Sequence, residues 1–90
     1  MKLLFAEDEV SMAEAVTDIL TYHNYTVDTV YDGADALDYA RAEQYDGIIL
    51  DIMMPKKSGL EVLKTLRSEG NTTPILPVSY TRLTLPTIRL

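Results

Sequence analysis

Residues 47–59 read GIILDIMMPKKSG, and they carry the strongest structural pattern in this chain of 90 residues. The first four are a continuous apolar run, which is typical of a strand buried on both faces of a parallel sheet. Asp51 follows this run directly, and a loop with Pro55 comes next. Ser58 and Glu61 then have the spacing of a helix-capping box. The segment therefore predicts a strand, an acidic turn and the start of a helix.

The same alternation of strand and helix extends outward from this segment. Short apolar or β-branched runs predict strands, and apolar residues at helical spacing predict helices. Ser11 and Glu14 have capping-box spacing at the first helix, and Asp32-Gly33 reads as a turn before the second. Such alternation predicts an α/β fold with right-handed βαβ units and a parallel sheet covered on both faces. The expected elements are strands at 2–6, 25–30, 47–50 and from 74, and helices at about 11–22, 34–43 and 58–69.

Composition narrows the class of protein. The net charge is −6, with 14 acidic and eight basic residues, which argues against direct nucleic-acid binding by this segment. The absence of cysteine excludes a disulfide framework and a cysteine-based metal site. The first apolar run ends at Glu7, so there is no signal peptide, and no run approaches the ~20 residues that a membrane span needs. We therefore expect a cytoplasmic protein that does not enter a membrane.

Three acidic residues follow two strands that are expected to be neighbours. Glu7 and Asp8 come after the first strand, and Asp51 comes after the third. Ligands of open parallel sheets bind at the carboxyl ends of the strands, where strand order reverses. Converging carboxylates repel one another, and a magnesium ion would relieve that repulsion. An aspartate there can act as a nucleophile and become an aspartyl phosphate. Solvated loop acids, or a simple magnesium or calcium site, are the alternatives.

Several motifs in the same order resemble the receiver domain of bacterial response regulators, the CheY-like superfamily. The match covers roughly residues 1–73. It implies a flavodoxin-like doubly wound parallel sheet, here incomplete, with about four strands and three helices. The motifs are Glu7-Asp8-Glu9, Tyr31-Asp32-Gly33 with Ala36-Leu37, Tyr45-Asp46, and Asp51 followed by Pro55 four residues later and Gly59 eight residues later.

The resemblance implies a role for each matching residue. Asp51 would accept a phosphoryl group from the phosphohistidine of a sensor histidine kinase. Asp8 and Asp51, with the backbone carbonyl of Met53, would bind Mg²⁺, and Glu7 would assist through a water. Ser79 stands in register with the family's switch hydroxyl.

The resemblance also implies partners. DNA would be reached only through an output domain that is absent from this chain, and an intact relative would form a phosphorylation-dependent dimer. The module would be a phosphoacceptor with at most its own phosphotransfer and slow self-dephosphorylation, and not an enzyme.

Two other functions compete with this interpretation. A phosphatase that forms an aspartyl phosphate would carry a second aspartate two residues after the nucleophile, where this chain has Met53. A receiver-like interaction module without chemistry would not need Glu7, Asp8 and Asp51 together. A truncated, inactive receiver-like interaction module is the alternative that we retain.

The resemblance ends near residue 75, so we expect a partial receiver domain at 1–75 and a non-family tail at 76–90. Pro77 falls inside the expected fourth strand, where a proline is normally confined to an edge. No later residue matches the family's lysine or its last strand and helices. The tail resembles a translated library or adapter sequence joined to a truncated gene, and a natural divergent terminus is the alternative. The 90-residue chain is therefore expected to be a poor receiver.

Overall fold

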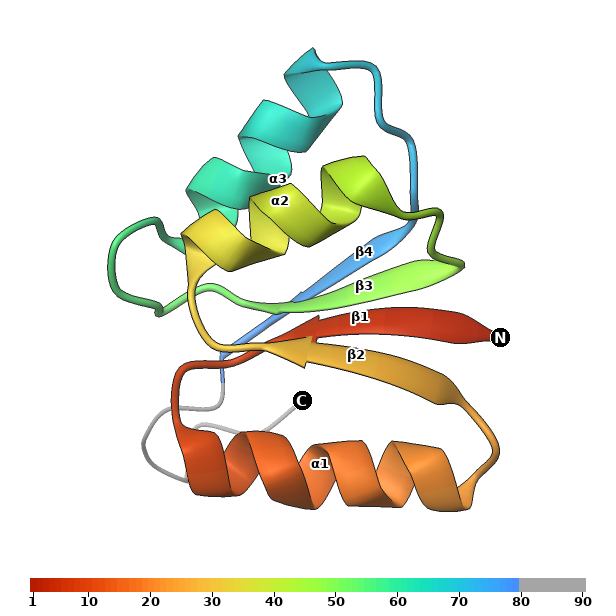
Figure 1. Cartoon of the computed structure of the whole chain (residues 1–90). Helices are drawn as coiled ribbons and strands as arrows, with labels where there is room; N and C mark the ends of the chain where they lie inside the picture. The colour runs from red at the N-terminus through yellow and green to blue at the C-terminus, as the bar shows by residue number, and fades with distance from the viewer. Residues whose placement is uncertain (80–90) are drawn as a thin grey trace.

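The computed structural model describes residues 1–79, which form a four-stranded sheet with helices on both faces (Figure 1). Strand and helix alternate along the chain as the sequence predicts. The elements are β1 (Lys2–Ala6), α1 (Val10–Tyr22), β2 (Thr26–Val30), α2 (Gly33–Ala42), β3 (Gly47–Asp51), α3 (Gly59–Ser68) and β4 (Ile75–Val78).

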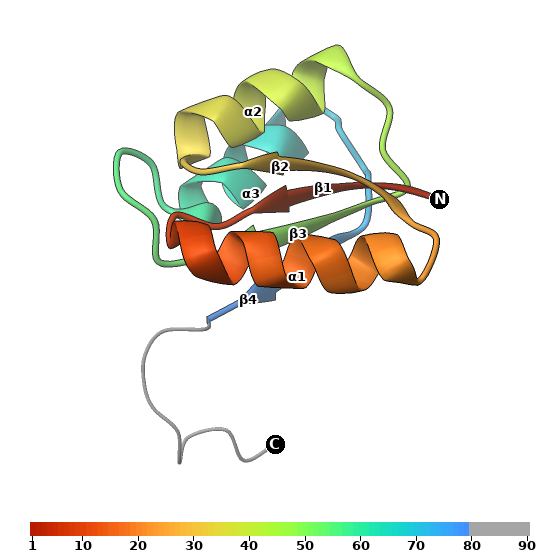
Figure 2. The same ribbon diagram turned by 60° about the horizontal axis from the view of Figure 1, so that its bottom comes forward.

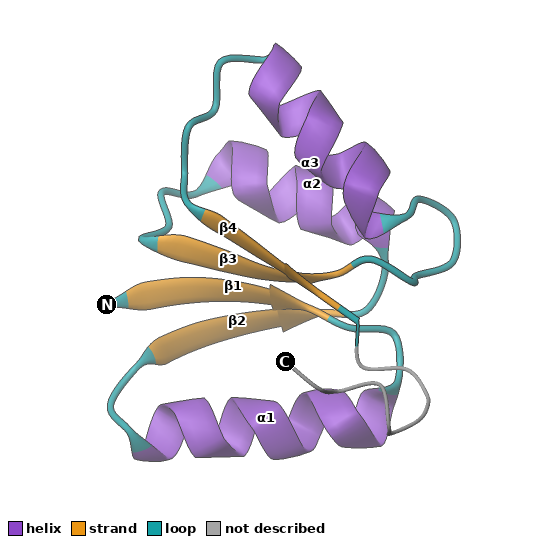
Figure 3. Cartoon of the chain, turned by 180° about the vertical axis from the view of Figure 1, so that it is seen from behind, coloured by secondary structure: helices purple, strands orange, loops and turns teal. Residues whose placement is uncertain are grey.

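All strand pairs are parallel, and the strand order is β2-β1-β3-β4. The chain moves outward from β1 to β2, and then crosses back over β1 to β3. Strand order therefore reverses between β1 and β3. Helix α1 lies on one face of the sheet, and α2 and α3 lie on the other (Figures 1 and 3). The predicted flavodoxin-like doubly wound sheet of four strands and three helices is confirmed.

The main hydrophobic core lies between the sheet and the α2–α3 layer. Side chains at alternate strand positions point to this face, because the side-chain period of a strand is two. Leu4, Leu50 and Leu66 are completely buried there. The cluster consists of Leu4, Ala6, Val30, Ala36, Leu37, Ala40, Tyr45, Ile48, Leu50, Met54, Val62 and Leu66.

On the opposite face, α1 covers only β1 and β2 (Figure 2). On β3 and β4 an apolar hollow of about 250 Å³ remains, with Leu3, Ile49 and Leu76 in its lining. Leu76 is 59% exposed in the described part of the chain. No helix within residues 1–79 combines the length and the apolar character that crossing a membrane requires.

Helix starts show which capping signals the chain uses. The predicted start of α1 at Ser11 is wrong, because the helix begins at Val10 and the Glu9 side chain caps it, accepting from the Met12 amide at 2.8 Å. Ser11 is already inside the helix and donates to Glu9 instead. The capping box of α3 is confirmed by two hydrogen bonds, Glu61 N to Ser58 Oγ at 3.3 Å and Ser58 N to Glu61 Oε1 at 3.0 Å.

The fourth strand extends three residues beyond the boundary expected at residue 75. The carbonyl of Pro74 accepts a hydrogen bond from the Ile48 amide in β3, and the carbonyl of Val78 accepts one from the Ile52 amide just after β3. Because backbone groups of a strand alternate in direction, Pro77 points away from β3, toward the edge of the described sheet. Its missing N–H therefore costs no ladder bond, which explains how a proline fits this strand. Residues 80–90 of the expected tail lie outside the described residues, and the domain boundary stays a prediction.

Candidate functional site

Three carboxylates meet at the carboxyl edge of the sheet. Glu7 and Asp8 follow β1, and Asp51 is the last residue of β3. These strands are direct neighbours, with Ala6 paired to Leu50, so their ends lie side by side. One oxygen from each of the three carboxylates lies within 4.8 Å of the others. The structure thus brings together the acidic residues that the sequence singled out, at the point where strand order reverses.

Glu7 is the most unusual member of the site, because its side chain is buried with only 2% exposed. Its Oε2 accepts a hydrogen bond from the Glu9 amide at 3.0 Å. Its Oε1 is buried without a hydrogen-bond partner among the described residues. Burial, together with the charges of Asp51 and Asp8, raises the pKa of Glu7 to about 7. An orphaned carboxylate oxygen beside two further carboxylates suits a hard cation such as Mg²⁺.

Asp51 is also buried, with 3% of its surface exposed. The amide of Met53 donates to its Oδ1 at 3.0 Å, which fixes the orientation of the carboxylate relative to the loop. The Met53 side chain is 54% exposed, and the contact of Met53 with Asp51 is made by its backbone amide. Asp8 is exposed, and it forms the solvent-facing side of the cluster.

Ser79 is exposed and follows directly after β4. Its preceding residue, Val78, is the strand partner of Asp51. Ser79 therefore stands one residue beyond the strand end next to the acidic cluster, and its role as a switch hydroxyl stays a prediction.

The loop after Asp51 holds features that the sequence did not reveal. The Lys56 side chain is largely exposed, and its ammonium lies 3.5 Å from the Asp32 carboxylate at the start of α2. Its backbone has a φ of 68°, which is unusual for a residue other than glycine. Asp32, predicted to be in a turn, is the N-cap of α2, and Gly33 is the first helical residue. An Asp-Gly pair directly before apolar residues at helical spacing could have predicted this N-cap from the sequence.

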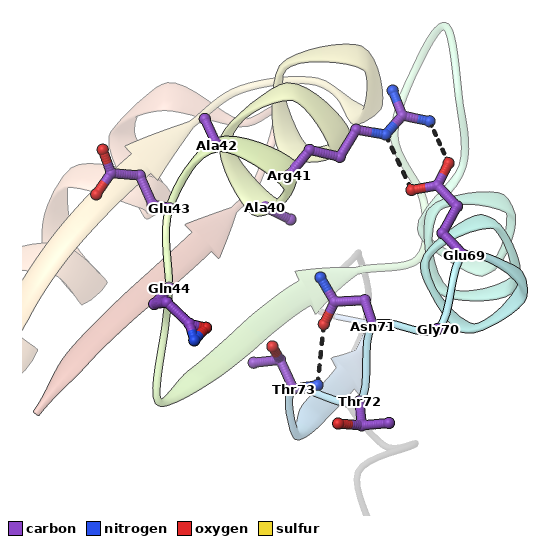
Figure 4. A pocket seen from close by; sticks show the side chains of 10 residues that line it. All are labelled: Ala40, Arg41, Ala42, Glu43, Gln44, Glu69, Gly70, Asn71, Thr72 and Thr73. Carbon is purple, nitrogen blue, oxygen red and sulfur yellow. Dashed lines mark hydrogen bonds and ion pairs between the residues drawn. The ribbon is translucent and has the colours of Figure 1, made fainter.

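A hollow of about 490 Å³ lies at the opposite edge of the sheet, near the amino ends of β3 and β4 (Figure 4). Its two acidic residues are neutralised. Glu69 forms a bidentate pair with Arg41, with distances of 3.0 and 2.6 Å, and Glu43 pairs with Lys2. The lining is formed by Ala40, Arg41, Ala42, Glu43, Gln44, Glu69, Gly70, Asn71, Thr72 and Thr73. Neither of these acidic residues is buried as Glu7 and Asp51 are, so the Glu7 cluster remains the candidate site.

The fold and the acidic cluster together define a doubly wound α/β domain with a cation-compatible site at the switch point of its sheet. A family model described as the response regulator receiver domain matches residues 3–87. The chain belongs to this family, so the predicted resemblance is confirmed. It is a signalling domain of the two-component type.

Similar proteins support this assignment. The transcriptional regulatory protein DltR of Streptococcus agalactiae is 50% identical over 76 residues, which cover 84% of this chain and 34% of the relative. The chain thus spans about a third of that relative's length. The receiver domain of the Francisella response regulator 1452 superposes with a TM-score of 0.85 at 30% identity, over 92% of this chain and 69% of that one.

A second solved structure bears on the site. The response regulator TrrA of Thermotoga maritima, solved in complex with Mg²⁺ and BeF, has a TM-score of 0.84 at 32% identity. The similarity covers 89% of this chain and 70% of that chain.

Proposed function

We propose that this chain is a phosphoacceptor module of a two-component response regulator, and that Asp51 receives the phosphoryl group. The observation that carries the proposal is the convergence of Glu7, Asp8 and Asp51, with Glu7 Oε1 buried and without a hydrogen-bond partner within residues 1–79. Membership of the receiver family supports the same function.

The residues present fit a magnesium ion. Asp8 and Asp51 would bind it with the backbone carbonyl of Met53, and Glu7 would act through a water. When bound, Mg²⁺ neutralises charge on the carboxylates and on the incoming phosphoryl group. The TrrA structure with Mg²⁺ and BeF, from a protein 32% identical, supports a site of this kind.

The chemical step requires only the Asp51 carboxylate as nucleophile. One carboxylate oxygen attacks the phosphorus of the donor's phosphohistidine, and the phosphorus–nitrogen bond breaks as the new phosphorus–oxygen bond forms. The electron pair of the broken bond returns to the imidazole nitrogen, which leaves as the donor histidine. The hydrogen bond from the Met53 amide holds the Asp51 carboxylate in a defined orientation during this attack. The product is an aspartyl phosphate.

The phosphoryl donor in the cell would be a sensor histidine kinase, acting in the cytoplasm. Because DltR is a transcriptional regulatory protein, DNA would be reached through an output domain outside this chain. Dimerisation on phosphorylation belongs to that longer protein. The module itself is not an enzyme beyond its own phosphotransfer and slow dephosphorylation, and Ser79 would contact the phosphoryl group.

Mass spectrometry with a small phosphodonor tests the proposal. The chain is incubated with acetyl phosphate, with and without Mg²⁺, and the gain of one phosphoryl group is measured. Asp51→Asn should abolish the gain, whereas Asp38→Asn, at an exposed position of α2, should leave it unchanged. Equal labelling of Asp51→Asn would refute the assignment. No labelling of the unaltered chain would favour the alternative, an inactive receiver-like interaction module.

A further inference from the structure

The loop that follows Asp51, residues 52–58, is packed closely against the first turn of α2. We call it the acceptor loop. Gly33, the first residue of α2, is buried against this loop. A Cβ added at Gly33 would overlap the Lys57 carbonyl oxygen and lie 2.7 Å from the Lys57 Cβ. Only a residue without a side chain therefore allows the helix and the loop to approach this closely.

A second contact joins the same two segments. The Lys56 ammonium lies 3.5 Å from Oδ2 of Asp32, while Oδ1 of Asp32 accepts the Asp35 amide at 2.8 Å and caps α2. The Asp35 amide and, to a smaller extent, the Lys56 charge hold the pKa of Asp32 below its usual value. One ionised carboxylate thus ties the helix start to the acceptor loop.

The backbone of the acceptor loop is strained at the point where these contacts act. Lys56 has a φ of 68°, and a residue with a Cβ pays ~1–2 kcal/mol for this left-handed conformation. Such a conformation persists only when its surroundings fix it. The Asp32 contact holds the side chain of Lys56, and the Gly33 contact holds the next residue, Lys57.

The far end of the loop is also closely packed. The Gly59 amide donates to the Ile52 carbonyl at 3.3 Å, which closes the loop on itself. A Cβ at Gly59 would overlap the Asp51 carbonyl oxygen and lie 2.7 Å from the Ile52 Cα. Because this end is closely packed against the end of β3, we expect a shift at Lys57 to reach Met53, whose amide donates to Asp51.

We propose that Gly33 and Asp32 are positioning residues for the acidic site. Through the acceptor loop, they keep the Met53 backbone at the place where it orients Asp51 and can bind a cation. The inference rests on the proposed function, because it concerns magnesium binding at the same site. Neither residue is assigned a part in the chemistry itself.

The test compares two glycine variants of the chain with Mg²⁺ alone as the probe. Gly33→Ala introduces the overlap with Lys57. Gly47→Ala is the matched control, because a Cβ there would meet only Leu3 Cδ2 at 3.4 Å and the Pro74 carbonyl oxygen at 3.9 Å. We expect Gly33→Ala to weaken Mg²⁺ binding roughly tenfold or more and to speed hydrogen exchange of the Met53 amide. The Gly47→Ala chain should match the wild type in both. Wild-type affinity in Gly33→Ala would overturn the inference.

A second pair of variants is used if circular dichroism shows that Gly33→Ala does not fold. Asp32→Ser keeps a capping side chain, and Lys56→Met removes the other partner of the same ion pair. The two changes alter the charge near the site in opposite directions. If the ion pair between Asp32 and Lys56 positions the acceptor loop, both variants should speed hydrogen exchange of the Met53 and Gly59 amides. Affinities that move in opposite directions, with unchanged exchange, would show a purely coulombic effect and overturn the inference.

Labelling of the wild-type chain separates this inference from the proposed function. A wild-type chain that binds Mg²⁺ more tightly than Gly33→Ala, but never gains a phosphoryl group on Asp51, would sustain the positioning role and refute the phosphoacceptor role. A wild-type chain that binds no Mg²⁺ would refute both.

Discussion

Replacing Glu7 by glutamine should stabilise the magnesium-free protein at neutral pH. The buried Glu7 carboxyl has its pKa raised from 4.5 to about 7, chiefly by burial. Between these values the folded state retains the proton and the unfolded state loses it, so the free energy of unfolding falls as the pH rises. At about 1.4 kcal/mol for each pH unit, the loss approaches about 3 kcal/mol above pH 7. Glutamine is neutral at every pH and avoids this loss.

Urea unfolding followed by circular dichroism at pH 5 and pH 7.5, without Mg²⁺, measures the effect. The wild type should lose stability between the two values, and Glu7→Gln should lose much less. Glu14→Gln, at an exposed position of α1, is the matched control and should follow the wild type. Asp32 and Glu69 have lowered pKa values, so their contributions are lost only in more acidic solution. If Glu7→Gln is only as stable as the wild type at pH 7.5, ionisation of the buried Glu7 carboxyl does not destabilise the folded state.

Three further outcomes follow from the site and the core. Asp8→Ala should weaken Mg²⁺ binding by roughly tenfold or more because a charged ligand is lost. Unchanged affinity in a calorimetric titration would show that Asp8 is not a ligand of the metal. Ser58→Ala removes half of a capping box and should lower the free energy of unfolding by about 1 kcal/mol in a urea titration. Leu66→Ala, at a fully buried position, should lower the free energy of unfolding by about 2–5 kcal/mol. Arg41→Gln should lower it far less because the ion pair of Arg41 is exposed, and equal losses would contradict this ranking.

Local patterns were sufficient to predict the order of strands and helices. The strand at residues 2–6 and the capping box at Ser58 depend on neighbouring residues alone, and both predictions are confirmed. The start of α1 was misplaced because Glu9 and Ser11 are both capable of capping a helix, and only the three-dimensional structure shows which side chain reaches the amide of Met12. Gly33 was assigned to a turn because the Asp-Gly pattern is shared by turns and helix starts.

Features that depend on non-local arrangement could not be predicted. Pro77 conflicted with the fourth strand until the sheet order showed that β4 is the edge of the described sheet. The grouping of Glu7, Asp8 and Asp51 could be predicted because they follow two strands that were expected to be neighbours in the sheet. The burial of Glu7 did not follow from the sequence, nor did the lack of a hydrogen-bond partner for its Oε1 among the described residues, because both depend on the packing around the site. The pairing of Lys56 with Asp32 joins segments 24 residues apart and has no local signature.

The most direct test of the central claim identifies the residue that carries the phosphoryl group. An aspartyl phosphate is reduced by borohydride to homoserine, which peptide mass spectrometry places in the sequence. After incubation of the chain with Mg²⁺ and acetyl phosphate, we expect homoserine, in low yield because the chain is predicted to be a poor receiver, at position 51 and at no other acidic residue. We also expect that homoserine is lost when Mg²⁺ is removed by chelation. Homoserine at another aspartate would show that Asp51 is not the phosphoacceptor, and formation at position 51 without Mg²⁺ would show that phosphorylation does not need the metal.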